Sequence, residues 1–100
     1  MITRDLAAKL SVLLVEEAPA GAVGPVMEWM QVLLHGGGQS ALDVVESEAK
    51  ARAGDLFEGE GIVEVGVVTR AFYRKIARLA LTAQADFERE QAELRRARKA

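Results

Sequence analysis

The longest regular pattern of apolar and polar residues in this chain runs from residue 64 to residue 98. On a helix drawn at about 100° per residue, the apolar side chains fall on one side and arginines fall on the other. Positions 70–99 contain neither Gly nor Pro. The apolar positions are Val65, Val68, Phe72, Ile76, Leu79, Ala83, Phe87 and Leu94. The pattern predicts one long amphipathic helix over residues 64–98.

The predicted helix is too long for the body that a chain of this size can form. Thirty helical residues measure roughly 45 Å at 1.5 Å rise per residue, whereas a compact chain of about 100 residues has a radius of gyration of only about 13 Å. Either part of the helix projects, or a second copy packs beside it. Residues 88–100 are mostly charged, and we expect them to form the projecting end.

Three shorter helices are predicted before it, over residues 4–18, 25–35 and 40–53. Pro19 and Gly21 end the first of them, and three glycines end the second. Between Val26 and Leu34 only two residues are polar, so we expect the second helix, including Leu33, to lie at the centre of the core. The fold class is therefore all-α, with four helices in a single domain spanning residues 1–100.

The start of each short helix is predicted from its capping residue. Thr3 suits the N-cap of the first helix, and Pro25 suits the first helical position of the second because its φ is already fixed. Ser40, with Asp43 three residues later, approximates a capping box for the third helix. These residues place the three helix starts.

One segment is ambiguous in its secondary structure. Residues 54–61 are predicted to form a loop whose Leu56 and Phe57 reach the core. Residues 62–68 have the composition of a strand, but no second segment of the chain offers a β partner. A helix from about residue 64 is the simpler interpretation, and an intermolecular strand is the alternative.

Composition indicates a globular protein and leaves its function open. Half of the residues are hydrophobic, 28% are charged, and cysteine is absent. Neither a signal peptide nor a membrane span is predicted in residues 1–17, so the expected location is the cytoplasm. The formal charge is −7 over residues 1–69 and +5 over residues 70–100. Such opposite poles favour antiparallel or head-to-tail association, or an acidic partner for the basic end.

The glycine-rich segment after residue 35 offers the main candidate for catalysis. His35-Gly36-Gly37-Gly38 resembles the oxyanion loop of lipase-like hydrolases. The serine motif of those enzymes requires a glycine at position 42, which is Leu42 here, and the chain has no second histidine. We expect a connector between two helices rather than an active site. The protein is predicted not to be an enzyme, with no metal and no cofactor.

The same segment also resembles the attachment site of phosphopantetheine carrier proteins, in which a serine opens a helix. That resemblance covers about eleven residues and points to Ser40 as the modified residue. Gln39 and Ala41 depart from the residues that flank the serine in that family. A carrier modified at Ser40 is therefore a remote alternative.

A basic stripe on the long helix supports a second function. Arg70, Arg74 and Arg78 follow one another at four-residue intervals, with Lys75 beside them. Such a stripe contacts a phosphate backbone or an acidic partner, forms a solvated face, or pairs with the acidic residues of the first three helices. The acidic character of the whole chain makes nucleic acid the less favoured partner.

We therefore predict a small, non-enzymatic protein that acts by protein–protein association, with no membrane contact. Its first partner is expected to be a second copy of itself, and another protein is the second candidate. The self-association residues are predicted on the apolar side of the last helix: Phe72, Ile76, Leu79, Ala83, Phe87 and Leu94.

Overall fold

The computed structural model describes residues 1–54 and 67–99, and this part of the chain contains four α-helices and no strand. A single 3₁₀ turn, η1 (Ala20–Ala22), joins the first two helices. The all-α, four-helix prediction is confirmed. The helices are α1 (Ile2–Glu16), α2 (Val23–His35), α3 (Gly38–Ala53) and α4 (Val67–Lys99).

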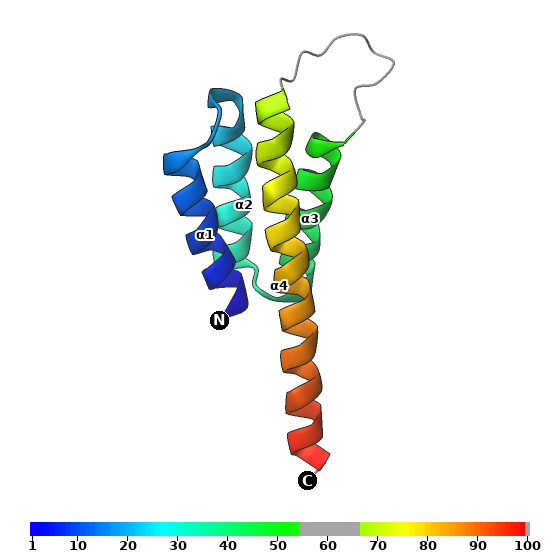
Figure 1. Cartoon of the computed structure of the whole chain (residues 1–100). Helices are drawn as coiled ribbons and strands as arrows, with labels where there is room; N and C mark the ends of the chain where they lie inside the picture. Colours follow the sequence, from blue (N-terminus) through cyan, green and yellow to red (C-terminus); the bar gives the residue numbers. More distant parts are fainter. Residues whose placement is uncertain (55–66, 100) are drawn as a thin grey trace.

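The helices run alternately up and down, and α4 is much longer than the other three (Figure 1). Helices α1 and α2 lie side by side, and α3 packs along the first half of α4. The 33 residues of α4 measure about 50 Å at 1.5 Å rise per residue. The molecule measures 57 × 28 × 18 Å, with a radius of gyration of 15.2 Å, because α4 runs past the ends of its neighbours.

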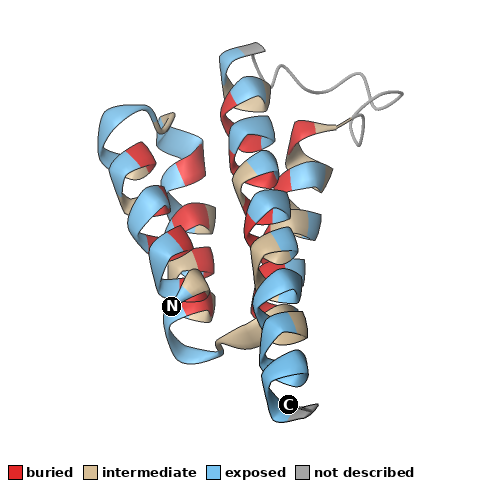
Figure 2. Cartoon of the chain, turned by 60° about the horizontal axis from the view of Figure 1, so that its bottom comes forward, coloured by how far each residue is buried: buried red, intermediate tan, exposed pale blue. Residues whose placement is uncertain are grey.

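The core lies between the four helices, where the buried faces point toward one another (Figure 2). Each helix supplies apolar residues at helical spacing, such as Leu10 of α1, Leu42 of α3 and Ile76 of α4, all fully buried. Trp29 and Leu33 are the buried residues at the centre of α2, which confirms the core position predicted for Leu33. Burying side chains of this size stabilises the fold by roughly 1.5–3 kcal/mol each.

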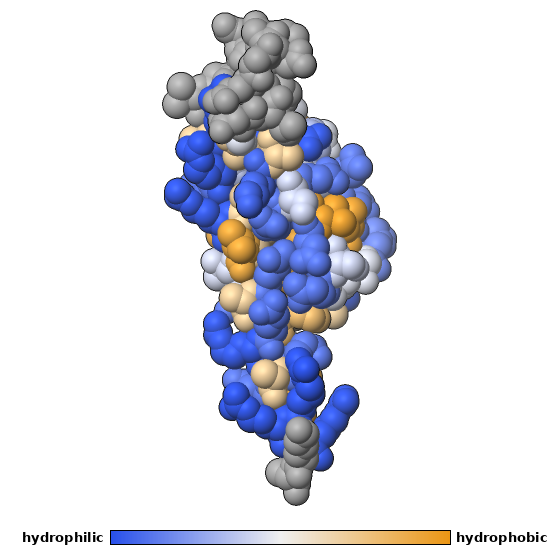
Figure 3. Space-filling view, turned by 90° about the vertical axis from the view of Figure 1, so that its right-hand side faces the viewer, coloured by the Kyte–Doolittle hydropathy of each residue, from blue (hydrophilic) through white to orange (hydrophobic). Residues whose placement is uncertain are grey.

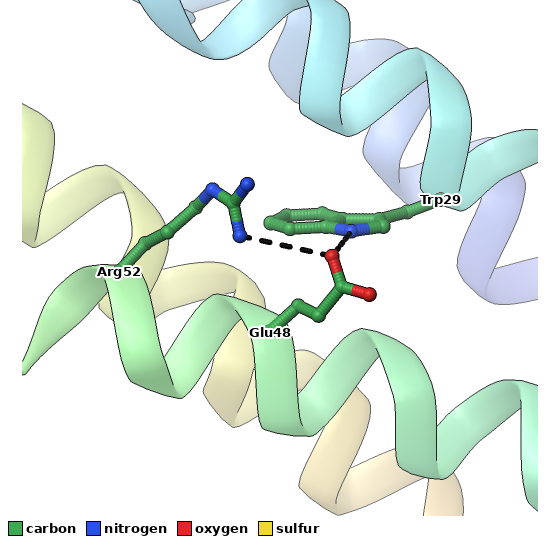
Figure 4. A network of polar contacts seen from close by, with 3 residues as sticks. All are labelled: Trp29, Glu48 and Arg52. Atoms are coloured by element: carbon green, nitrogen blue, oxygen red, sulfur yellow. Dashed lines mark hydrogen bonds and ion pairs between the residues drawn. The ribbon is translucent and has the colours of Figure 1, made fainter.

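Polar contacts among Trp29, Glu48 and Arg52 link α2 to α3 at the edge of this core (Figure 4). The indole Nε1 of Trp29 donates a hydrogen bond of 3.0 Å to Glu48 Oε1. Arg52 Nη1 lies 3.7 Å from the same oxygen, and its guanidinium stands 5.5 Å from the centroid of the Trp29 ring. The edge of Tyr73 from α4 also meets the Trp29 ring, with 6.0 Å between centroids. The buried indole therefore has its polar atom satisfied.

The predicted helix starts were wrong by two residues. Helix α1 begins at Ile2, so Thr3 lies inside it and is buried rather than serving as a cap. Helix α2 begins at Val23, and Pro25 is its third residue. Proline is tolerated there because the first four N–H groups of a helix have no acceptor within the helix. At its other end, α1 stops at Glu16, two residues before the predicted residue 18.

The glycine connector between α2 and α3 is confirmed, and it also moves the start of α3. Gly37 and Gly38 have φ values of 66° and 75°, in the left-handed region that favours glycine. They reverse the chain so early that α3 begins at Gly38, and Ser40 lies in its first turn instead of capping it. Asp43 forms no capping box. It accepts hydrogen bonds from Gln39 at 3.2 Å and from Gln84 of α4 at 2.8 Å.

Residues 55–66 lie outside the described part of the chain. They include Leu56 and Phe57 of the predicted loop, Val65, and the first residues of the ambiguous segment 62–68. The last two residues of that segment, Val67 and Val68, belong to α4. The predicted helix start at residue 64 also falls outside the described residues.

Candidate functional site

The predicted self-association residues of α4 fall into three groups by burial. Phe72, Ile76 and Ala83 are buried in the core of their own chain. Leu79 and Phe87 are partly buried and pack against that core. Leu94 is 48% exposed. The buried residues are therefore covered by their own chain, whereas the side chain of Leu94 remains accessible to a partner.

Leu94 belongs to the part of α4 that projects from the helical body (Figure 1). We call residues 88–98 the α4 extension. Its side chains are exposed apart from two half-buried positions, Gln91 and Ala92. Figure 3 shows the extension as a narrow, mostly hydrophilic rod below the wider body.

The apolar stripe of the core continues along the α4 extension. Tyr73, Ala80, Phe87 and Leu94 are spaced by seven residues, so they lie on the same side of the helix. The first two are buried, the third is partly buried, and Leu94 is about half exposed. The stripe thus runs out of the core onto a helix that no other described element covers.

The charges of the α4 extension are sorted along its length. Glutamates occupy positions 88, 90 and 93, together with a single basic residue, Arg89, which pairs with Asp86 at 3.0 Å. Arginines occupy positions 95, 96 and 98, with no acidic residue among them. Residues 88–93 therefore carry −2 and residues 94–98 carry +3.

A small cleft of about 70 Å³ lies between α1 and α4. Its lining combines apolar Leu6, Leu79 and Ala83 with the charged residues Asp5, Lys9 and Asp86. The described residues contain no group of three or more His, Asp or Glu side chains placed to hold a metal ion. The cleft is thus a small opening beside the apolar side of α4.

The predicted basic stripe is only partly available. Arg74 and Arg78 are exposed on α4. Lys75 Nζ forms an ion pair of 2.8 Å with Glu17 Oε2 at the end of α1, which the sequence did not predict. Arg70 is half buried, and its Nε has no hydrogen-bond partner among the described residues. Three of the four residues are therefore exposed, and one of these, Lys75, is held in an ion pair.

His35 and Ser40, the residues that resembled hydrolase or carrier motifs, are not joined to each other in the structure. His35 Nε2 lies 2.8 Å from Gln31 Oε1, one turn earlier in α2, so its ring is paired within its own helix. Ser40 is exposed in the first turn of α3. Among the described side chains no hydrogen bond joins the histidine to the serine.

A second apolar surface was missed by the sequence analysis. Val23, Met27 and Leu34 of α2 are exposed, although this helix was predicted to lie wholly in the core. Val12 and Val15 of α1 are also exposed. The signal was available in the spacing of positions 23, 27, 30 and 34, which forms a second stripe beside the buried one.

None of the described helices is both long enough and apolar enough to cross a membrane. No protein-family model, curated protein or solved structure matches the chain.

Proposed function

We propose that this chain is a small, non-enzymatic assembly protein that associates with a second copy of itself through the α4 extension. One observation carries the proposal: the apolar stripe of the core continues to Leu94, which its own chain leaves 48% exposed. A symmetric contact covers such a stripe by using the same surface twice.

The physical reason is that the end of a helix without tertiary contacts is only marginally stable. The extension continues an existing helix and needs no new nucleus, but its last turns fray where no tertiary contact holds them. The α4 extension has eleven residues, and its hydrogen-bonded side chains contact only residues of α4 itself. Covering Leu94 against another helix removes apolar surface from water and holds the extension in its helical form.

The proposal is tested with two matched substitutions, Leu94→Glu and Leu81→Glu. Both leucines lie on α4 and are about half exposed, at 48% and 53%. They are thirteen residues apart, which places them on different sides of the helix at about 100° per residue. Because neither leucine is buried, both variants should keep the cooperative thermal melting of the helical body in dilute samples.

Sedimentation equilibrium over a range of concentrations gives the outcome. We expect the wild type and Leu81→Glu to associate, and Leu94→Glu to remain at the monomer mass of 10.8 kDa. Equal masses for Leu94→Glu and wild type would contradict the proposal, as would a monomeric wild type at every concentration.

Binding of nucleic acid is the second candidate function, supported by the exposure of Arg74 and Arg78. The ion pair of Lys75 with Glu17 and the acidic character of the chain weigh against it. We expect no binding of DNA or RNA at low salt. Binding that disappears in Arg74→Glu/Arg78→Glu would instead favour this alternative.

A further inference from the structure

We infer that two chains join antiparallel, with the α4 extension of one packed along the α4 extension of the other and the two helical bodies at opposite ends. This inference rests on the proposed function and adds the direction of the contact. Two observations carry it: the position of the apolar stripe relative to the body, and the order of charges along the extension.

The position of the stripe restricts how a second helix can approach. Leu94 lies on the same side of α4 as Tyr73, Ala80 and Phe87, which belong to the core or pack against it. The α4 extension runs past the ends of the other helices (Figure 1), so a helix packed on this side of the extension lies below the helical body. A parallel partner would have to continue upward through that body. An antiparallel partner enters from the open end and meets no such obstacle.

The order of charges along the extension also favours an antiparallel contact. An antiparallel overlap sets residues 88–93 of one chain, with charge −2, beside residues 94–98 of the other, with charge +3. The symmetry of the dimer repeats this pairing on the other half of the contact. A parallel overlap sets glutamates beside glutamates and arginines beside arginines, which is repulsive.

The length of the extension sets the register. When residues 88–98 of both chains overlap fully, Leu94 of each chain lies opposite Ala92 of the other. The overlap is about 16 Å long at 1.5 Å rise per residue. Such an interface is smaller than that of most stable complexes, so we expect a reversible dimer with a Kd of about micromolar or weaker.

Charge reversal tests the pairing of the two halves. Arg95→Glu/Arg96→Glu/Arg98→Glu should weaken dimerisation at least about tenfold, because six glutamates then line each extension. Adding Glu88→Arg/Glu90→Arg/Glu93→Arg to the same chain should restore it, since opposite charges face each other again. Raising the salt concentration should weaken the wild-type dimer. A dimer that strengthens with salt, or that the first variant leaves unchanged, would overturn the antiparallel arrangement.

The separation of the two bodies gives an independent readout. The chain has no cysteine, so Arg74→Cys carries a single spin label at an exposed position of α4. In the antiparallel dimer the two labels are about 55 Å apart along the helices, from 1.5 Å rise per residue. A parallel dimer places them at the same height, within about 35 Å, as helix axes pack only about 8–10 Å apart.

The outcomes distinguish the two proposals. A wild-type chain that stays monomeric overturns both the proposed function and the antiparallel contact. A dimer that depends on Leu94 but shows the short label distance overturns only the antiparallel contact. A dimer with the long distance and the rescue by double charge reversal supports both.

Discussion

The two halves of α4 have the same apolar period and different surroundings. In the first half, Phe72, Ile76 and Ala80 are buried on α4, which packs mainly against α3 and also against α1. In the second half, the same face continues to Leu94, where the neighbouring helices have already ended. The comparison shows that a helical period identifies the apolar side of a helix, whereas the lengths of its neighbours decide which part becomes core and which becomes surface.

The greatest loss of stability is expected from a substitution in the first half of α4, and the same kind of substitution in the second half is the comparison. Ile76→Ala should lower the free energy of unfolding by about 2–5 kcal/mol, because Ile76 is fully buried and its loss leaves a cavity. Leu94→Ala should change the stability of the monomer by less than about 0.5 kcal/mol. Urea unfolding of dilute samples measures both values. A similar loss in the two variants would mean that the extension packs against its own chain.

The second effect tests the polar link between α2 and α3. Glu48→Ala should destabilise the fold by about 1–3 kcal/mol, because it leaves the buried Nε1 of Trp29 without an acceptor. Glu48→Gln should lose less, as its amide oxygen still accepts that hydrogen bond. Glu46→Ala, two residues earlier on α3, is the control and should be nearly neutral. Equal melting temperatures for Glu48→Ala and the control would contradict the role assigned to the hydrogen bond.

The third effect concerns the turn that positions α3 beside α4. Gly37→Ala should destabilise by about 1–2 kcal/mol, because a Cβ disfavours the left-handed φ of 66°. Gly21→Ala is the matched control, since a Cβ there meets no atom within 4 Å and its φ is not in that region. Thermal melting of both variants measures the difference. A Gly37→Ala chain that melts like the control would show that the turn has another conformation.

The smallest effect comes from the N-terminal end of the body. Thr3 is 2% exposed, and its hydroxyl has no hydrogen-bond partner among the described residues. Thr3→Val keeps the shape and removes the unsatisfied group, so it should raise stability by up to about 1 kcal/mol. Thr3→Ser keeps the hydroxyl and should lower stability. If Thr3→Val melts below Thr3→Ser, the hydroxyl has a partner that stabilises the fold.

The sequence predicted the number and order of the helices because their apolar spacing is regular. It misplaced the helix starts where a residue near the start is compatible with more than one position in the first turn. Pro25 fits the first or the third helical position equally well, since no N–H is needed at either. Ser40 resembled a cap, but Gly37 and Gly38 turn the chain two residues earlier. Such choices depend on how the connected helices dock.

The candidate surface was harder to predict for a related reason. Met27 and Leu34 look like core residues from their hydrophobicity, but they lie beside the stripe that α2 buries. Phe72 and Leu94 share one face of α4 and differ in exposure only because the body ends between them. The ion pair of Lys75 with Glu17 joins residues 58 positions apart, which no local pattern reveals.

Amide hydrogen exchange at several protein concentrations tests the central claim most directly, because it reports on each half of α4 separately. We predict that the amides of residues 88–98 exchange rapidly in dilute solution and become at least about tenfold more protected as the protein associates. The amides of residues 72–83 should be protected equally at every concentration. Exchange in residues 88–98 that does not depend on concentration would contradict the assignment of the α4 extension as the association surface.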